Sequence, residues 1–166
     1  KTSYTIGELE NLSEAELEAL IISKNSDDAR YVLGKLLLDG TSDKIKKNEK
    51  KGTNWIKEAI NNGHLGALEY KTYYDIRFDK QPKMKKIIDN LESLVEKTKS
   101  TRALNLLAEF NYAQDKVEGS KENAAKYYNM SAERGDQLGI HWMGVFYHLG
   151  FGVQKNVEKA IELLRK

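Results

Sequence analysis

The chain has 166 residues, which is enough for one domain or one short array of repeats. Its 27 basic and 25 acidic residues give a formal net charge of +2, and this balance argues against a dedicated nucleic-acid-binding protein, which usually has a strong basic excess. The sequence contains no cysteine, so disulfides, thiol catalysis and Cys-based zinc sites are excluded, and no apolar run reaches the about 18 residues of a membrane-spanning helix. Only one proline is present, which favours a helical fold.

The N-terminal segment, residues 1–24, is expected to contain one helix that caps the rest of the fold. Ser13-Glu-Ala-Glu16 has the pattern of a capping box, which predicts a helix over about residues 14–24. Five acidic residues surround this helix start: Glu8, Glu10, Glu14, Glu16 and Glu18. Carboxylates there interact favourably with the helix dipole. We therefore interpret them as structural rather than as an acid–base pair, which would need a pocket that raises one pKa.

From residue 25 onward the sequence repeats. The first helix of each unit is marked by Ala29, Ala67, Ala103 and Gly139, which are 38, 36 and 36 residues apart. Apolar residues recur at helical spacing in each half of a unit, so every unit predicts two helices of about 12 to 15 residues. The expected repeats cover approximately residues 25–62, 63–98, 99–134 and 135–166.

Helix ends and helix crossings also have sequence signals. Glycines stand just past the expected helix ends, at Gly40, Gly63, Gly135 and Gly150. Residues suited to N-caps are Asn48, Ser120 and Asn156. Small residues share one position in the first helices (Gly34, Ala108, Gly144) and one in the second helices (Gly52, Ala124, Ala160). Because helices approach closely only where side chains are small, we expect crossings at these positions.

These residues resemble the Sel1-like repeat family, which is related to the tetratricopeptide repeats. The last repeat matches best, with Met143-Gly144, Tyr147, Gly150, Gly152-Val153, Asn156 and Lys159-Ala160. The first keeps Leu33-Gly34, Gly40, Asn48, Lys51, Trp55, Ala59 and Gly63-His64, and the third keeps Ala103, Leu107, Ala124, Tyr127-Tyr128, Ala132 and Gly135. The second departs most, with Lys99 in place of a glycine and no Leu-Gly pair near Tyr70-Lys71-Thr72. Its first helix could be shifted by one residue.

The resemblance implies an all-α fold, a right-handed superhelical solenoid of antiparallel helix pairs, and a role in protein–protein interaction. By analogy with tetratricopeptide repeats, a partner should lie on a concave face formed by first-helix residues that flank the packing Leu-Gly pair. The expected partner-binding residues are Tyr31, Lys35 and Asp39; Glu69, Tyr73 and Arg77; Arg102, Asn105, Glu109 and Tyr112; and His141 and His148. Some of the tyrosines could instead pack between helices, and of Tyr73 and Tyr74 we expect one to face the core and one the groove.

Two other surfaces remain alternatives for binding: the N-terminal segment and a basic edge. Lysines cluster beside the loops within the first two repeats, at Lys44, Lys46, Lys47, Lys50 and Lys51 and at Lys80, Lys83, Lys85 and Lys86. Such an edge could meet an acidic partner or anionic lipid. We interpret it as a solvated surface, with the two clusters expected to be neighbours on one edge.

Signals for chemistry are weak. The P-loop, G-x-S-x-G, H-E-x-x-H and G-x-G-x-x-G motifs are absent. His141 and His148 are seven residues apart on one helix face, and Glu109 could supply a third zinc ligand. That spacing is too wide for most imidazole rotamers, so we expect surface histidines, no metal and no cofactor. His64 is expected to be structural.

The sequence therefore predicts a non-enzymatic protein-binding module, an adaptor or inhibitor, that acts as a monomer and does not bind nucleic acid. One alternative is a bacterial immunity protein that neutralises a secreted toxin such as a lipase or another hydrolase, because short exported family members serve in this way. Another is a cell-wall-associated enzyme or ligand binder, although the relatives linked to such ligands carry a cysteine pair in each repeat. The first residue is Lys1 rather than Met, so we favour export, to the periplasm or as a lipid-anchored envelope protein, over the cytoplasm.

Overall fold

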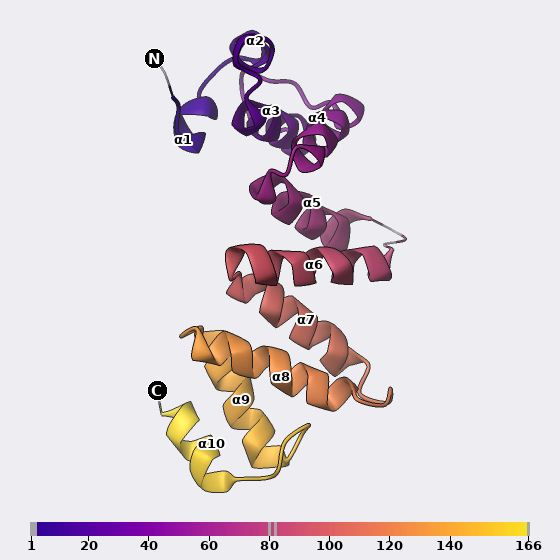
Figure 1. The fold of residues 1–166 in the computed structure, drawn as a ribbon, viewed down its shortest axis with the longest axis vertical. Helices are drawn as coiled ribbons and strands as arrows, with labels where there is room; N and C mark the ends of the chain where they lie inside the picture. Colours follow the sequence, from indigo (N-terminus) through magenta and orange to yellow (C-terminus); the bar gives the residue numbers. More distant parts are fainter. Residues whose placement is uncertain (1–2, 80, 82, 166) are drawn as a thin grey trace. The chain divides into compact units, whose positions relative to one another are not determined.

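In the computed structural model, which describes residues 3–79, 81 and 83–165, every regular element is an α-helix (Figure 1). The helices are α1 (Ile6–Leu9), α2 (Glu14–Lys24), α3 (Asp27–Asp39), α4 (Glu49–Asn61), α5 (Leu65–Phe78), α6 (Met84–Thr98), α7 (Thr101–Ala113), α8 (Ser120–Glu133), α9 (Gln137–Leu149) and α10 (Val157–Leu164). The all-α prediction is confirmed. The chain divides into two compact units, Lys1–Pro82 and Lys83–Lys166, and the two helices expected for the second repeat, α5 and α6, fall in different units.

The N-terminal helices begin at two capping boxes. At α2, Ser13 Oγ accepts the Glu16 N–H (3.4 Å) and Glu16 Oε2 accepts the Ser13 N–H (2.8 Å). Hydrogen bonds from the Ser13 side chain and backbone lower the pKa of Glu16. Thr5 and Glu8 form the same motif at α1, a four-residue helix that is too short for hydrophobic periodicity to reveal. The prediction of a helix over residues 14–24 is confirmed.

The first helix of each repeat starts at an N-cap whose side chain accepts a backbone N–H three residues ahead. These N-caps are Ser26, His64, Ser100 and Asp136. Thr72 lies eight residues after its N-cap, as Gly34, Ala108 and Gly144 do after theirs, and it is fully buried. The second repeat therefore keeps the register that places Glu69, Tyr73 and Arg77 at the positions of Tyr31, Lys35 and Asp39.

Two of the three N-caps expected for the second helices are confirmed. Asn48 and Asn156 cap α4 and α10 by accepting the N–H groups of Lys51 and Lys159. The prediction for Ser120 is wrong. Gly119 occupies the cap with φ 77°, which turns the chain one residue earlier and leaves Ser120 as a buried first helical residue.

The predicted crossing of α3 and α4 lies at two glycines. A Cβ added to Gly34 would lie 2.7 Å from Ile56 Cγ1 and 3.0 Å from the Gly52 carbonyl oxygen. A Cβ added to Gly52 would lie 2.9 Å from the Gly34 carbonyl oxygen and 2.9 Å from Leu38 Cγ. The pairs 34 with 56 and 38 with 52 show that the two helices run antiparallel, with their backbones nearly in contact.

The hydrophobic core of unit 2 contains two buried aromatic rings. Tyr128 and Phe146 are at most 1% exposed, and they pack with Met143, Ala108 and Ala124. Ala160 of α10 is 1% exposed, so small residues also occupy the expected crossing positions here. Among the described helices none is both long enough and apolar enough to cross a membrane.

Candidate protein-binding surface

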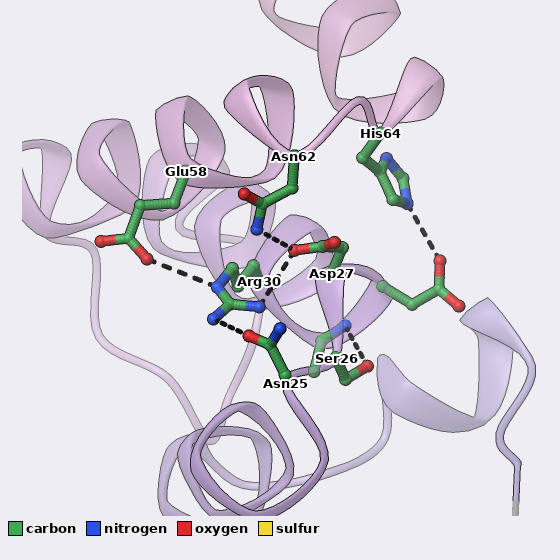
Figure 2. A network of polar contacts seen from close by, with 9 residues as sticks. Asn25, Ser26, Asp27, Arg30, Glu58, Asn62 and His64 are labelled. Atoms are coloured by element: carbon green, nitrogen blue, oxygen red, sulfur yellow. Dashed lines mark hydrogen bonds and ion pairs between the residues drawn. The ribbon is translucent and has the colours of Figure 1, made fainter.

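A polar network fixes the start of α3 against the helices beside it (Figure 2). The Arg30 guanidinium donates to Asn25 Oδ1 (2.6 Å) and to Asp27 Oδ1 (3.0 Å). Asn25 is the C-cap of α2. Its Nε lies 3.4 Å from Glu58 Oε2 of α4, and Asn62 Nδ2 donates to Asp27 Oδ1 (2.7 Å). The Arg30 side chain is only 11% exposed, so this network is a structural tie between helices.

His64 is structural, as the sequence predicts, and it joins α5 to α3 (Figure 2). Its Nδ1 accepts the Ala67 N–H (2.9 Å), which caps α5. Because Nδ1 accepts, the ring proton is on Nε2, which donates to Asp28 Oδ1 of α3 at 2.9 Å. The imidazole also lies 4.9 Å from the Tyr31 ring.

Four rings form a continuous aromatic row along α3 and α5. The row consists of Tyr31, Tyr70, Tyr74 and Phe78, with successive centroid distances of 6.2, 5.9 and 4.8 Å. The Tyr70 hydroxyl donates to Asp39 Oδ1 at 2.6 Å. The pKa of Tyr70 is raised, mainly because of burial and secondly because of this hydrogen bond. The tyrosines are half-buried, whereas Phe78 is 60% exposed, so the row runs from the contact between the helices out to solvent.

The residues expected to bind a partner in unit 1 differ in exposure. Asp39 and Arg77 are exposed, whereas Tyr31, Glu69 and Tyr73 are half-buried, and the Tyr73 hydroxyl oxygen is inaccessible to solvent. Lys35 pairs with Glu10 at 2.8 Å, and this hydrogen bond raises the pKa of the Lys35 ammonium.

In unit 2, Arg102, Glu109, His141 and His148 are exposed on α7 and α9. Tyr112 is 42% exposed, although its ring also packs 5.4 Å from Trp142 and 5.8 Å from Phe146.

Asn105 has a different place from the other expected binding residues. It is only 8% exposed, and its Nδ2 donates to Asp136 Oδ2 at 2.9 Å. The Asn105 side chain therefore belongs to the contact between α7 and α9, and we leave it out of the proposed binding surface.

A hollow of about 710 Å³ opens in unit 1 beside the end of α5. Its lining consists of Leu38, Asp39, Thr41, Lys47, Glu49, Tyr74, Asp75, Arg77, Phe78 and Asp79. It brings together Asp39 and Arg77, two of the expected binding residues, with two rings of the aromatic row. Tyr74 and Phe78 were visible in the sequence as residues four apart, but spacing alone does not tell which neighbour or solvent a helix face meets.

Much of the first lysine cluster is bound within the chain. Lys44 Nζ donates to the Asn11 carbonyl oxygen (2.6 Å), Lys47 pairs with Glu49 (3.1 Å), and Lys51 pairs with Glu14 and Glu18. These pairs agree with a structural role for the N-terminal acids. In the second cluster Lys83, Lys85 and Lys86 are exposed, and Lys80 lies outside the described residues. Lys83, Lys85 and Lys86 belong to unit 2 and the first cluster belongs to unit 1, so their expected proximity remains a prediction.

Nothing in residues 3–79, 81 and 83–165 brings three His, Asp or Glu side chains close enough to hold a metal ion. The set that the sequence analysis considered as a zinc site, His141, His148 and Glu109, is therefore not brought together as one.

Comparison with known proteins places the chain. The model of the Sel1 repeat matches residues 27–64, 101–136 and 138–166. A solved protective antigen with an SLR fold, present in uropathogenic Escherichia coli strains, is 19% identical with a TM-score of 0.77, over 93% of this chain and 32% of that one. A Sel1 repeat protein from Oxalobacter formigenes is 21% identical with a TM-score of 0.68, over 87% of this chain and 57% of that one. This chain thus spans about a third of the first protein and somewhat more than half of the second. A search of curated proteins found no match. Since the repeat model covers more than half of the sequence, the protein belongs to the Sel1 repeat family and has its solenoid fold of antiparallel helix pairs.

Proposed function

We propose that the protein is a non-enzymatic adaptor or inhibitor that holds one partner protein on the exposed faces of α3, α5, α7 and α9, the first helices of the repeats. Sel1 repeats are generally protein-interaction modules. The observation that carries the proposal is the mixture of exposed aromatic and charged side chains on these helices. Phe78 is 60% and Tyr112 is 42% exposed, and Arg77 and Arg102 lie on the same helices. Aromatic residues and arginine supply much of the binding energy in protein interfaces.

The groups with shifted pKa values support a non-enzymatic role. Strongly shifted groups gather at active sites in many enzymes. Here Glu16 and Asp136 have a lowered pKa and cap helices, while Lys35 and Lys51 have a raised pKa and form ion pairs with N-terminal acids. Each of these four groups has a structural task that accounts for its shift. The pKa is also raised for four tyrosines, mainly by burial: Tyr31, Tyr70, Tyr127 and Tyr128.

The test is capture of a partner from an extract of the source organism, with the tagged 166-residue chain as bait and mass spectrometry as readout. A binding-face variant would combine Arg102→Ala, Glu109→Ala and His148→Ala on α7 and α9. A matched control would combine Lys57→Ala, Glu96→Ala and Lys126→Ala, which are exposed residues of the second helices α4, α6 and α8. We expect one stoichiometric partner whose recovery falls at least about tenfold with the first variant and is unchanged with the second.

Equal recovery with both variants would refute the proposed face, and failure to retain any protein from soluble and membrane fractions would refute the binding-module proposal. The captured protein also separates the two versions of the proposal. A secreted hydrolase that the chain inhibits would make it an immunity protein. A partner without an inhibited activity would make it an adaptor.

A further inference from the structure

The hollow beside the end of α5 is acidic on a chain whose overall charge is slightly positive. Four carboxylates line it, from Asp39, Glu49, Asp75 and Asp79, against two cations, Lys47 and Arg77. The lining therefore has a formal charge of −2, whereas the whole chain has +2. This local reversal of sign favours a cationic occupant.

Two of the four carboxylates form no ion pair among the residues that the structure describes. Glu49 pairs with Lys47 at 3.1 Å, and Asp75 pairs with Lys71 one helical turn away. Asp39 accepts the Tyr70 hydroxyl (2.6 Å), and Asp79 accepts the Gln81 N–H (2.9 Å). Both of these donors are neutral. Lys35 attracts Asp39 electrostatically but forms its ion pair with Glu10, so neither Asp39 nor Asp79 is held in an ion pair within the described residues.

The apolar part of the lining consists of the rings of Tyr74 and Phe78 and the buried side chain of Leu38, and Phe78 is the most exposed of the three. Phe78 is 60% exposed, its ring lies 4.8 Å from that of Tyr74, and the Arg77 guanidinium carbon lies 5.5 Å from the Phe78 ring. An aromatic face attracts a cation, and a neighbouring carboxylate adds a charge-assisted hydrogen bond. The hollow therefore offers carboxylates to the head group of a Lys or Arg side chain and an exposed ring to the residue beside it.

The aromatic row indicates the shape of such an occupant. Its rings are spaced by 6.2, 5.9 and 4.8 Å. Alternate side chains of an extended chain are roughly 6.6 Å apart, so side chains on one side of an extended segment could follow the row.

We propose that this hollow accepts a Lys or Arg side chain from an extended segment of the partner protein, with an apolar residue of that segment packed on Phe78 and Tyr74. This rests on the proposed function and names the chemistry of the partner at one part of its binding face. Asp39 and Asp79 bind the cationic head group, and the aromatic row binds its apolar neighbours.

The experiment selects peptides from a phage-displayed library of random dodecapeptides on the immobilised 166-residue chain. We expect enrichment of sequences with Lys or Arg within two residues of an aromatic or aliphatic residue. The affinity of a selected peptide, measured by fluorescence anisotropy, should fall about 2- to 5-fold with Asp39→Asn or Asp79→Asn alone, as for exposed ion pairs. It should also fall as salt is raised.

Matched variants make the result specific. Phe78→Ala should lower the affinity for the selected peptide about tenfold, since a large aromatic contact is lost. Asp115→Asn and Leu149→Ala remove an exposed charge and an exposed apolar side chain in unit 2, and both should leave the affinity unchanged. Circular dichroism of every variant checks that helix content is retained.

Selection of acidic peptides, an empty selection where a peptide-binding control domain yields binders, or affinities insensitive to Asp39→Asn, Asp79→Asn and Phe78→Ala would overturn the proposal. These outcomes are distinct from failure of the proposed function. A partner captured through α7 and α9 but indifferent to the hollow variants would leave the binding module standing without this basic-segment site.

Discussion

The contact between α3 and α5 in unit 1 and the contact between α7 and α9 in unit 2 use aromatic residues in opposite ways. In unit 1 the row from Tyr31 to Phe78 becomes more exposed along α5, and Phe78 is 60% exposed. In unit 2 Phe146 is fully buried, and Tyr112 stacks on it with a centroid distance of 5.8 Å. Equivalent contacts between successive first helices thus provide an open surface in one unit and a core in the other.

The hydrogen bonds at the two contacts also differ in exposure: the one in unit 1 is more exposed than the one in unit 2. The N-cap His64 bonds to Asp28, whose side chain is 55% exposed. The N-cap Asp136 bonds to Asn105, which is only 8% exposed. The comparison teaches that the repeat fixes where helices meet, while side-chain identity decides whether a contact is buried or open to solvent.

The largest effect we expect comes from removing one phenylalanine from each contact. Phe146→Ala should destabilise the protein by about 3–5 kcal/mol, because a fully buried ring leaves a cavity. Phe78→Ala should change stability by less than about 0.5 kcal/mol, because most of its ring already meets water. Urea unfolding followed by circular dichroism measures both. Similar losses would show that the contrast between the two contacts is false.

A second prediction extends the comparison to the helix crossings. Gly34→Ala should cost about 1–3 kcal/mol, because its Cβ would meet Ile56 Cγ1 at 2.7 Å and the Gly52 carbonyl at 3.0 Å. At Gly144 the closest atom is Leu164 Cγ at 2.6 Å, on a side chain that is 49% exposed, and the nearest backbone atom is 3.5 Å away. Leu164 can move aside, and alanine favours the helix by roughly 0.5–1 kcal/mol, so Gly144→Ala should be nearly neutral.

The midpoint of urea unfolding distinguishes the two variants. A cost at Gly144 equal to that at Gly34 would mean that Leu164 is fixed in place and that both crossings are equally tight.

The third prediction uses the buried polar tie of unit 2. Burial alone would raise the pKa of Asp136, but hydrogen bonds from Asn105 and the Gly139 N–H lower it overall. Because the folded state favours the carboxylate form of Asp136, this carboxylate stabilises the fold above the unfolded pKa of about 3.9. The stabilisation is lost as the pH falls through the lower folded pKa.

Asp136→Asn keeps an N-cap of similar strength, removes the charge and replaces one carboxylate oxygen by an NH2 group. Its stability deficit, about 1 kcal/mol at pH 7, should shrink as the pH falls below about 4 and disappear once the pH is below the lowered pKa of Asp136. Asp136→Ala should cost about 1–2 kcal/mol at pH 7. Urea unfolding across this pH range is the measurement, and a deficit of Asp136→Asn that is constant with pH would rule out the charge as its source.

Local signals explain which parts of the fold could be predicted from sequence. The capping box at Ser13, the Asn48 and Asn156 N-caps and the paired small residues at Gly34 and Gly52 act over short spacings or at repeated positions, so one sequence is enough to identify them. Ser120 was misplaced because the turn at Gly119 uses a positive φ, which moves the helix start by one residue.

The proposed binding surface was harder to predict because its exposure depends on contacts between repeats. Asn105 has the register of Tyr31, yet its amide meets Asp136, which is 31 residues further along the chain. Likewise, the spacing of Tyr70, Tyr74 and Phe78 was visible, but the four-residue period does not show which face of α5 meets α3. Periodicity finds the helices, and the side chains opposite each face determine what that face can do.

The smallest effect belongs to the hydroxyl that joins the aromatic row to the acidic hollow. Tyr70→Phe keeps the ring contacts and removes the donor to Asp39, so we expect a loss of only about 0.5–1 kcal/mol. Burial and then Asp39 raise the pKa of Tyr70 above 10.0, so the hydroxyl stays protonated in the neutral range and this loss should be the same at pH 6 and pH 8. Without that donor, Asp39 should bind a basic peptide slightly more tightly, by up to about twofold. Fluorescence anisotropy against the wild-type chain tests this, and a weaker peptide would mean that the hydroxyl itself contacts the ligand or holds Asp39 in its binding position.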